Sequence, residues 1–184
     1  LRIIPTAGEK AIREAAEFSD GIICFDVDMP EEAQSIRNLG VPYIISHHTA
    51  SFAGFERCST DNREGGRLQA QLLFEQGARR PLYINGLTEE VRPHAERLAG
   101  FLEFWKECAA DARQPIVIMV EPGERGGASA SVEAAGLFKS GACDGAAAVN
   151  DITLIGVLNG LARSGELELL NGLPLCGYDA VPFR

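Results

Sequence analysis

Short apolar runs alternate with amphipathic stretches along this chain, and this alternation limits the folds that it can adopt. The stretch from residue 146 to residue 161 shows the pattern most clearly. It contains the apolar run Ala146–Val149, the polar pair Asn150-Asp151, and apolar residues at every third position, namely Ile152, Ile155, Leu158 and Leu161. The short run predicts a buried strand, and the later spacing predicts a helix. Strand–helix units repeated along a chain form parallel sheets with right-handed crossovers.

The same pattern extends through the rest of the sequence. Strands are predicted at residues 2–4, 21–25, 41–45, 81–84, 116–120, 146–149 and 173–179. Helices are predicted at residues 9–18, 30–38, 61–76, 96–110, 130–138 and 152–161. Residues 49–60 are predicted to be irregular, and the glycine-rich residues 123–127 are predicted to form a loop. The sequence therefore predicts the α/β fold class with parallel sheets.

The composition is typical of a globular protein with an acidic surface. The chain has 184 residues, of which 46% are hydrophobic, and its formal net charge is −9 at pH 7. No cluster of lysine and arginine offers a surface for phosphate backbones, so this segment itself is expected to bind nucleic acid poorly. No apolar run approaches the roughly 18 residues of a membrane-spanning helix. No signal or transit peptide is visible in the sequence.

Five cysteines are scattered along the sequence without a CxxC pair. An odd, dispersed set indicates reduced thiols in the cytoplasm, rather than a disulfide framework or a zinc site. The sequence therefore predicts a cytoplasmic protein, and it predicts neither a metal ion nor a cofactor.

The sequence lacks the motifs of common enzyme sites. It contains no G-x-G-x-x-G after the first predicted strand, no P-loop and no G-x-S-x-G nucleophile elbow. His47 and His48 are adjacent, so on a strand they point to opposite faces and do not chelate one metal together. Polar residues do follow the predicted strands, at Asp26, His47, Asn150 and Asp179. Polar groups at strand ends without a catalytic set indicate a ligand-binding protein rather than an enzyme.

Four short motifs occur in a characteristic order across nearly the whole chain. They are Asp61–Leu68 followed by Gly77–Arg80, Arg97–Phe101 (Arg-x-x-Gly-Phe), Ala148–Asp151 followed by Ile155-Gly156, and Gly177–Asp179. Together they resemble the lactose/galactose-repressor (LacI/GalR) family. The resemblance implies the effector-binding and dimerisation core of a bacterial transcriptional repressor. It also implies a periplasmic-binding-protein-like type I fold, in which two doubly wound parallel-sheet lobes close over a small polar effector such as a sugar or a nucleobase.

The resemblance further implies where the lobes and the effector contacts lie. Residues 1–60 would form the lobe nearer the DNA, and residues 61–184 would form the far lobe. The implied contacts are Arg97, Asn150 and Asp179 in the far lobe, His47 and Phe25 in the near lobe, and Glu124 in the loop after the strand at 116–120. His47 stands where many relatives have an acid. The loop that contains Glu124 lacks the aromatic residue that many relatives have there.

Against the family pattern, the chain is expected to be incomplete at both ends. By that pattern the DNA-reading headpiece, the first central strand of the near lobe and the segments after Phe183 are expected to lie outside the given sequence. The intact regulator is expected to be a homodimer that binds operator DNA through its headpiece.

Simpler interpretations exist for the far-lobe contacts. Either Asn150 or Asp151 would cap the helix at 152–161. Arg97 would form a surface ion pair, with Glu96 or Glu103 beside it in the sequence. Asp179 would begin a turn.

Two other protein classes share the predicted fold. A periplasmic solute-binding protein would carry an export signal upstream and few free cysteines. An enzyme would carry a nucleophile or a cofactor loop at a strand end.

Overall fold

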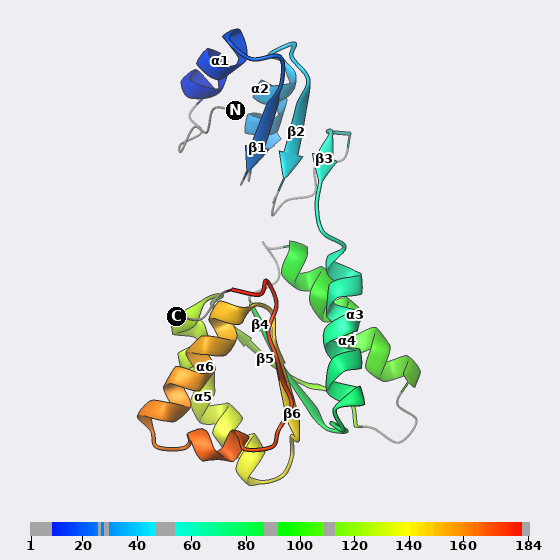
Figure 1. Ribbon diagram of the computed structural model, residues 1–184, viewed down its shortest axis with the longest axis vertical. Coiled ribbons are helices and arrows are strands. Elements are labelled where there is room, and N and C mark those ends of the chain that lie inside the picture. The colour runs from blue at the N-terminus through cyan, green and yellow to red at the C-terminus, as the bar shows by residue number, and fades with distance from the viewer. Residues whose placement is uncertain are drawn as a thin grey trace. The chain divides into compact units, whose positions relative to one another are not determined.

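Two separate parallel sheets form the framework of the chain, as a computed structural model shows (Figure 1). The structure describes residues 9–25, 27, 30–46, 54–86, 92–108 and 113–181. The chain divides into two compact units, Leu1–Thr60 (unit 1) and Asp61–Arg184 (unit 2). The strand predicted at residues 2–4 and the strand-end residues Asp26 and His47 lie outside the described residues.

Unit 1 contains a small parallel sheet. Its elements are α1 (Glu9–Glu17), β1 (Ile22–Phe25), α2 (Pro30–Arg37), β2 (Tyr43–Ser46) and β3 (Arg57–Cys58), and the strand order is β1-β2-β3. Strand β3 falls within the stretch that was predicted to be irregular. One face of the sheet packs into a core of Val27, Ala33, Ile36 and Ile45. Side chains alternate along β1, so Phe25 points away from this core and is exposed over 62% of its surface.

Unit 2 contains the larger sheet. Its elements are α3 (Asn62–Glu75), β4 (Pro81–Gly86), α4 (Arg92–Cys108), β5 (Ile116–Val120), α5 (Glu124–Lys139), β6 (Gly145–Ala148), α6 (Asp151–Arg163), the 3-10 helix η1 (Leu167–Leu170) and β7 (Leu175–Cys176). The strands are parallel in the order β5-β4-β6-β7, so the chain winds outward from β4 in both directions. Helices α3 and α4 cover one face, and α5 and α6 cover the other (Figure 1). This is the predicted doubly wound arrangement.

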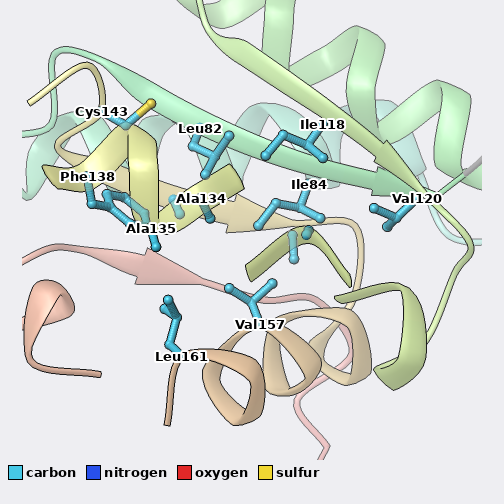
Figure 2. Close-up of a cluster of buried hydrophobic side chains, with 13 residues drawn as sticks. Leu82, Ile84, Ile118, Val120, Ala134, Ala135, Phe138, Cys143, Val157 and Leu161 are labelled. Carbon is cyan, nitrogen blue, oxygen red and sulfur yellow. The ribbon is translucent and has the colours of Figure 1, made fainter. Parts of the chain in front are cut away.

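The two faces of this sheet have different cores because side chains alternate along the strands. Leu82 and Ile84 of β4 lie in the apolar core under α5 and α6, together with Val157 and Leu161 of α6 (Figure 2). Tyr83, between them in sequence, lies in the core under α3 and α4. That second core is rich in aromatic rings, with Tyr83 and Phe101, Phe74 and Phe104, and Phe101 and Trp105 in contact.

Helix α5 begins six residues earlier than the sequence predicted, at Glu124 instead of Ala130. The glycine-rich residues 123–127 were predicted to form a loop, and this prediction was wrong. Gly126 and Gly127 are buried within the helix. A Cβ atom on Gly127 would lie 1.9 Å from the carbonyl oxygen of Thr153 in α6. Glycine is therefore needed here because the backbones of α5 and α6 approach each other closely.

Helix α4 also begins earlier than predicted, at Arg92 instead of Glu96. Pro93 lies in its first turn, where a missing backbone N–H leaves no helical hydrogen bond unmade. Arg97 is consequently in the second turn of the helix and not at its first residue. None of the described helices has the length and apolarity that a membrane span requires.

Candidate functional site

The candidate site lies at the carboxyl ends of β4, β6 and β7 in unit 2. The chain leaves β6 through Val149 and Asn150, and it leaves β7 through Gly177 to Asp179. A hydrogen bond connects these two exits, since the backbone N–H of Asp151 donates to the carbonyl oxygen of Tyr178 over 2.8 Å. The strand ends that the sequence singled out in the far lobe are therefore neighbours in space.

Arg97 reaches this edge of the sheet from α4 and is only 6% exposed. Its Nε donates to Oδ1 of Asn62 over 2.9 Å, and its Nη1 donates to the carbonyl oxygen of Val149 over 2.7 Å. The guanidinium carbon lies 3.6 Å from the centroid of the Tyr178 ring. Its Nη2 lies 3.9 Å from a carboxylate oxygen of Asp179. Arg97 thus joins α3, β6 and the segment after β7.

The alternative interpretation of Arg97 as a surface ion-pair residue was wrong. Glu103 accepts hydrogen bonds from Arg63, and Glu96 accepts one from Arg92 over 2.6 Å. Both acids that flank Arg97 in the sequence therefore pair with other arginines, and Arg97 is directed into unit 2.

Asn150 caps helix α6. Its Oδ1 accepts a hydrogen bond from the backbone N–H of Thr153 over 2.9 Å, and its backbone is extended, as is usual for a residue before a helix. The capping role that the sequence offered for Asn150 or Asp151 is therefore confirmed for Asn150. The cap engages Oδ1, which leaves the Nδ2 donors of the same amide for a second partner.

Asp179 lies in a segment with uncommon backbone geometry. Asp179 and Ala180 have positive φ angles of 99° and 55°. Residues other than glycine seldom adopt this region unless neighbouring contacts enforce it. The Asp179 side chain is 42% exposed, so its carboxylate is accessible to a ligand.

The other three predicted contacts are not among the residues of unit 2 that the structure describes at this site. Glu124 is the first residue of α5, and its carboxylate accepts a hydrogen bond from Asn159 of α6 over 3.0 Å. Phe25 belongs to unit 1, and His47 lies outside the described residues. Contacts of these three residues with an effector remain predictions.

Four residues outside the predicted effector contacts contribute to the site, and of these the sequence analysis had noted only Asp151, as a possible helix cap. Asn62 holds Arg97, and Tyr178 stacks on it. Gln69 is buried, and its Nε2 donates to the carbonyl oxygens of Ala148 and Gly177 over 2.8 and 2.9 Å. Asp151 binds the segment after β7. Asn62 and Gln69 lie seven residues apart on α3 and so on one face. Their spacing, which places two polar side chains on the same face of one predicted helix, was the feature of the sequence that could have identified Asn62 and Gln69.

Two buried polar side chains, one in β4 and one in α4, lack hydrogen-bond partners in the part of the chain that the structure describes. They are Asn85, whose amide nitrogen and oxygen are both unpaired, and His94, whose Nδ1 is unpaired. His94 lies one helical turn before Arg97. Burial, together with the smaller effect of the positive charge of Arg97, lowers the pKa of His94 to about 4. The imidazole is therefore neutral at pH 7. Within the described ranges, no three acids, histidines or cysteines cluster as metal ligands.

No family model and no curated protein sequence matches this chain. Solved structures do. A LacI-family transcriptional regulator from Enterococcus faecalis with bound ribose is 24% identical, with a TM-score of 0.67 over 94% of this chain and 61% of the regulator. A periplasmic binding protein/LacI transcriptional regulator from Alkaliphilus metalliredigens with D-xylulofuranose is 20% identical, with a TM-score of 0.67 over 94% and 61%.

A third similar structure belongs to a transporter. It is an ABC transporter periplasmic solute-binding protein from Actinobacillus succinogenes with bound D-allose, which is 20% identical with a TM-score of 0.73 over 95% of this chain and 64% of that protein. The chain therefore spans less than two thirds of the length of these proteins. The predicted resemblance is confirmed at the level of the fold. The chain has the periplasmic-binding-protein-like type I fold that LacI-family transcriptional regulators and periplasmic solute-binding proteins share.

Proposed function

We propose that this chain is the effector-binding core of a LacI-type transcriptional regulator that senses a sugar. The observation that carries the proposal is the cluster of Arg97, Tyr178 and Asp179 beside Asn150, at the carboxyl end of the unit 2 sheet. In open α/β sheets, ligands bind at this edge. Two of the reported regulator structures hold a sugar, which supports a ligand of that class.

The chemistry of the cluster suits a neutral polyhydroxyl compound. A carboxylate such as Asp179 accepts from two hydroxyl groups, and the Nδ2 group of Asn150 donates to one. The guanidinium of Arg97 already donates to two neutral acceptors and faces Asp179. The site thus has no surplus positive charge to bind a phosphate. We therefore place neutral sugars ahead of sugar phosphates and nucleotides.

Calorimetric titration of the full-length protein tests this proposal. The ligands are D-ribose, D-allose, D-xylulose and cellobiose, with ribose 5-phosphate as the charged comparison. Saturable binding of a neutral sugar, weakened strongly by Asp179→Ala, is the expected result. Failure of every neutral sugar to bind, or tighter binding of ribose 5-phosphate, contradicts the proposal.

The regulatory role requires assembly and DNA binding by the whole protein. We propose a cytoplasmic homodimer, because operators with two-fold symmetry match a two-fold dimer. The acidic charge of this chain agrees with DNA contacts in a separate headpiece. Effector binding would change operator affinity by about 5- to 150-fold. Sedimentation of the full-length protein and operator titration with and without the sugar measure both properties. A monomer at micromolar concentration, or an operator affinity that the bound sugar leaves unchanged, would count against this role.

A periplasmic solute-binding protein is the second candidate. The transporter component from Actinobacillus succinogenes has the higher TM-score among the structures reported above, 0.73 against 0.67. The free cysteines Cys24, Cys58, Cys143 and Cys176 favour a reducing compartment instead. Cell fractionation of the natural host decides between the two, because a regulator stays with the cytoplasmic fraction. Both candidates are binding proteins. Turnover of sugar phosphates or nucleotides by the purified protein would contradict both and would show that the protein is an enzyme.

A further inference from the structure

The segment from Gly177 to Val181 holds Asp179 in a conformation that the chain does not favour by itself. Both Asp179 and Ala180 have positive φ angles. Backbone strain of this kind persists where surrounding contacts enforce it, and it is concentrated at functional positions. The contacts that enforce it here identify the residues that prepare Asp179 for a ligand.

Asp151 supplies two of these contacts, one on each side of the strained pair. Its backbone N–H donates to the carbonyl oxygen of Tyr178 over 2.8 Å. Its carboxylate Oδ2 accepts from the backbone N–H of Val181 over 2.7 Å. The two bonds therefore bracket Asp179 and Ala180, and they come from a residue at the rigid start of α6.

Gly177 and Gln69 complete this arrangement. A Cβ atom on Gly177 would lie 1.9 Å from the other carboxylate oxygen of Asp151, so only glycine lets Asp151 approach the segment. Gln69 donates to the carbonyl oxygen of Gly177 over 2.9 Å from α3. The segment is thus held from two helices on opposite faces of the sheet.

We propose that Asp151 is a positioning residue that presents the Asp179 carboxylate to the effector. The inference rests on the sugar-binding function proposed above. A first-turn acid also stabilises a helix through the helix dipole, but that role needs no contact with Val181. Asp151 holds Asp179 within 3.9 Å of Arg97, with the Asp179 carboxylate still partly exposed. The effector then meets an acceptor whose orientation is set before binding.

The test compares Asp151→Ala and Asp151→Asn in the full-length protein, with D-ribose, D-allose, D-xylulose and cellobiose as probes. Asp151→Ala removes the acceptor for Val181 and is expected to raise the Kd of the bound sugar by about tenfold or more, as for loss of a bond to a charged group. Asparagine keeps a side-chain oxygen that accepts the same N–H. Asp151→Asn is therefore expected to restore most of the affinity.

Asp144 provides the matched control. Its carboxylate accepts the backbone N–H groups of Arg79 and Arg80 over 3.0 and 2.7 Å. Asp144 lies just before β6 and Asp151 lies just after it. Because this strand of four residues spans about 13 Å, Asp144 is at the opposite end of the strand from the site. Asp144→Ala should lower the urea midpoint to a similar degree and leave the Kd unchanged. A Kd that rises equally in both alanine variants overturns the proposal, because the effect would then be general destabilisation.

A rescue experiment separates positioning from stability. Glycine adopts positive φ as readily as negative φ, so Ala180→Gly lowers the strain that Asp151 otherwise overcomes. In the Asp151→Ala background it is expected to recover part of the lost affinity. The same substitution in the wild type is expected to change the Kd by less than about threefold. No recovery in the double variant contradicts the positioning role.

Hydrogen exchange of the Val181 amide gives a readout that needs no ligand. In Asp151→Ala this amide is expected to lose its protection, while in Asp144→Ala it keeps the wild-type rate. Unchanged protection in Asp151→Ala overturns the positioning role by itself. If the wild type binds none of the sugars, the proposed function fails. The exchange rates then still report whether Asp151 holds the segment.

Discussion

The guanidinium of Arg97 stacks on the ring of Tyr178, with its central carbon 3.6 Å from the ring centroid. A cation over an aromatic face is stabilised by the ring quadrupole, most strongly where water is excluded. Arg97 is also bonded to Asn62 and to the carbonyl oxygen of Val149. The side chain therefore has a structural role in unit 2 besides any contact with an effector, and the two roles predict separate outcomes.

Replacing Arg97 with alanine is expected to reduce the free energy of unfolding by about 2–4 kcal/mol, because buried acceptors on Asn62 and Val149 lose their donor. Urea unfolding measures the loss. Arg63→Ala is the control, since the Arg63–Glu103 pair is exposed and its removal should leave the midpoint unchanged. An Arg97→Ala midpoint equal to that of the wild type would show that Arg97 is not held as the structure describes.

Substitution of Arg97 is also expected to weaken the binding of the effector. Arg97→Ala should raise the Kd of the bound sugar by at least about 30-fold, as for the loss of a buried, charged hydrogen-bond donor. Arg97→Lys should recover part of the lost affinity, because lysine keeps the positive charge but cannot present two parallel N–H donors as the planar guanidinium does. Calorimetry at a temperature where all variants are folded separates affinity from stability. Binding within about threefold of the wild type, which is below about 0.7 kcal/mol, would exclude Arg97 from the ligand contacts.

Substitutions at Asn150 distinguish the helix cap from the ligand contact. Asn150→Ala is expected to cost about 1 kcal/mol of stability, because the Thr153 N–H loses its acceptor. Asn150→Ser keeps a capping oxygen and should unfold at nearly the wild-type urea concentration, but it removes the Nδ2 donors. A serine variant that binds the sugar as tightly as the wild type would limit Asn150 to the cap.

The close contact between α5 and α6 predicts opposite effects for two glycines of one helix. Gly127→Ala should destabilise unit 2 by about 1–3 kcal/mol, since the added Cβ would meet the Thr153 carbonyl oxygen and force the helices apart. Gly136→Ala should stabilise it by about 0.5–1 kcal/mol, because nothing lies within 4 Å of the added Cβ and alanine favours helix. Thermal unfolding of both variants compares them. Equal effects would rule out the close packing.

The neutral state of His94 predicts a pH dependence of stability. Its pKa is lowered from an ordinary value of 6.5 to about 4. Between these values the unfolded state binds a proton that the folded state does not, so stability is complete above pH 6.5 and falls as the pH drops toward 4. The difference in unfolding free energy between the wild type and His94→Asn, measured from pH 7 to pH 4, isolates this group. A flat difference would show that His94 is not buried.

The unpaired amide of Asn85 predicts that an apolar residue of similar size is tolerated. Asn85 is completely buried in β4, and neither amide atom has a partner among the described residues. Asn85→Leu is expected to raise the free energy of unfolding by about 1 kcal/mol, because the penalty of an unsatisfied buried amide is removed. A lower melting temperature for this variant would instead reveal a bound water or another polar partner for Asn85.

Much of the architecture could be predicted from local pattern. The apolar run at residues 116–120 matches β5 at both ends, and the predicted strand at 81–84 lies within β4. These elements were readable because strand and helix periodicities differ, and because unit 2 buries its strands under helices on both sides. Asn150 and Asp179 could be selected because they follow predicted apolar strands, whose ends meet at one edge of the sheet. Arg97 lies in a helix and was selected only through the resemblance of Arg97–Phe101 to the family motif.

The tertiary structure decided what those residues contact. The start of α5 depends on glycines that would weaken an isolated helix, and only the approach of α6 explains them. Arg97 could have paired with acids beside it in sequence, but its partners lie on α3, on the exit of β6 and after β7. The bond between Asp151 and Val181 likewise joins residues 30 positions apart. Local sequence sets the periodicity of each element, whereas contacts between distant elements depend on how the sheet brings their ends together.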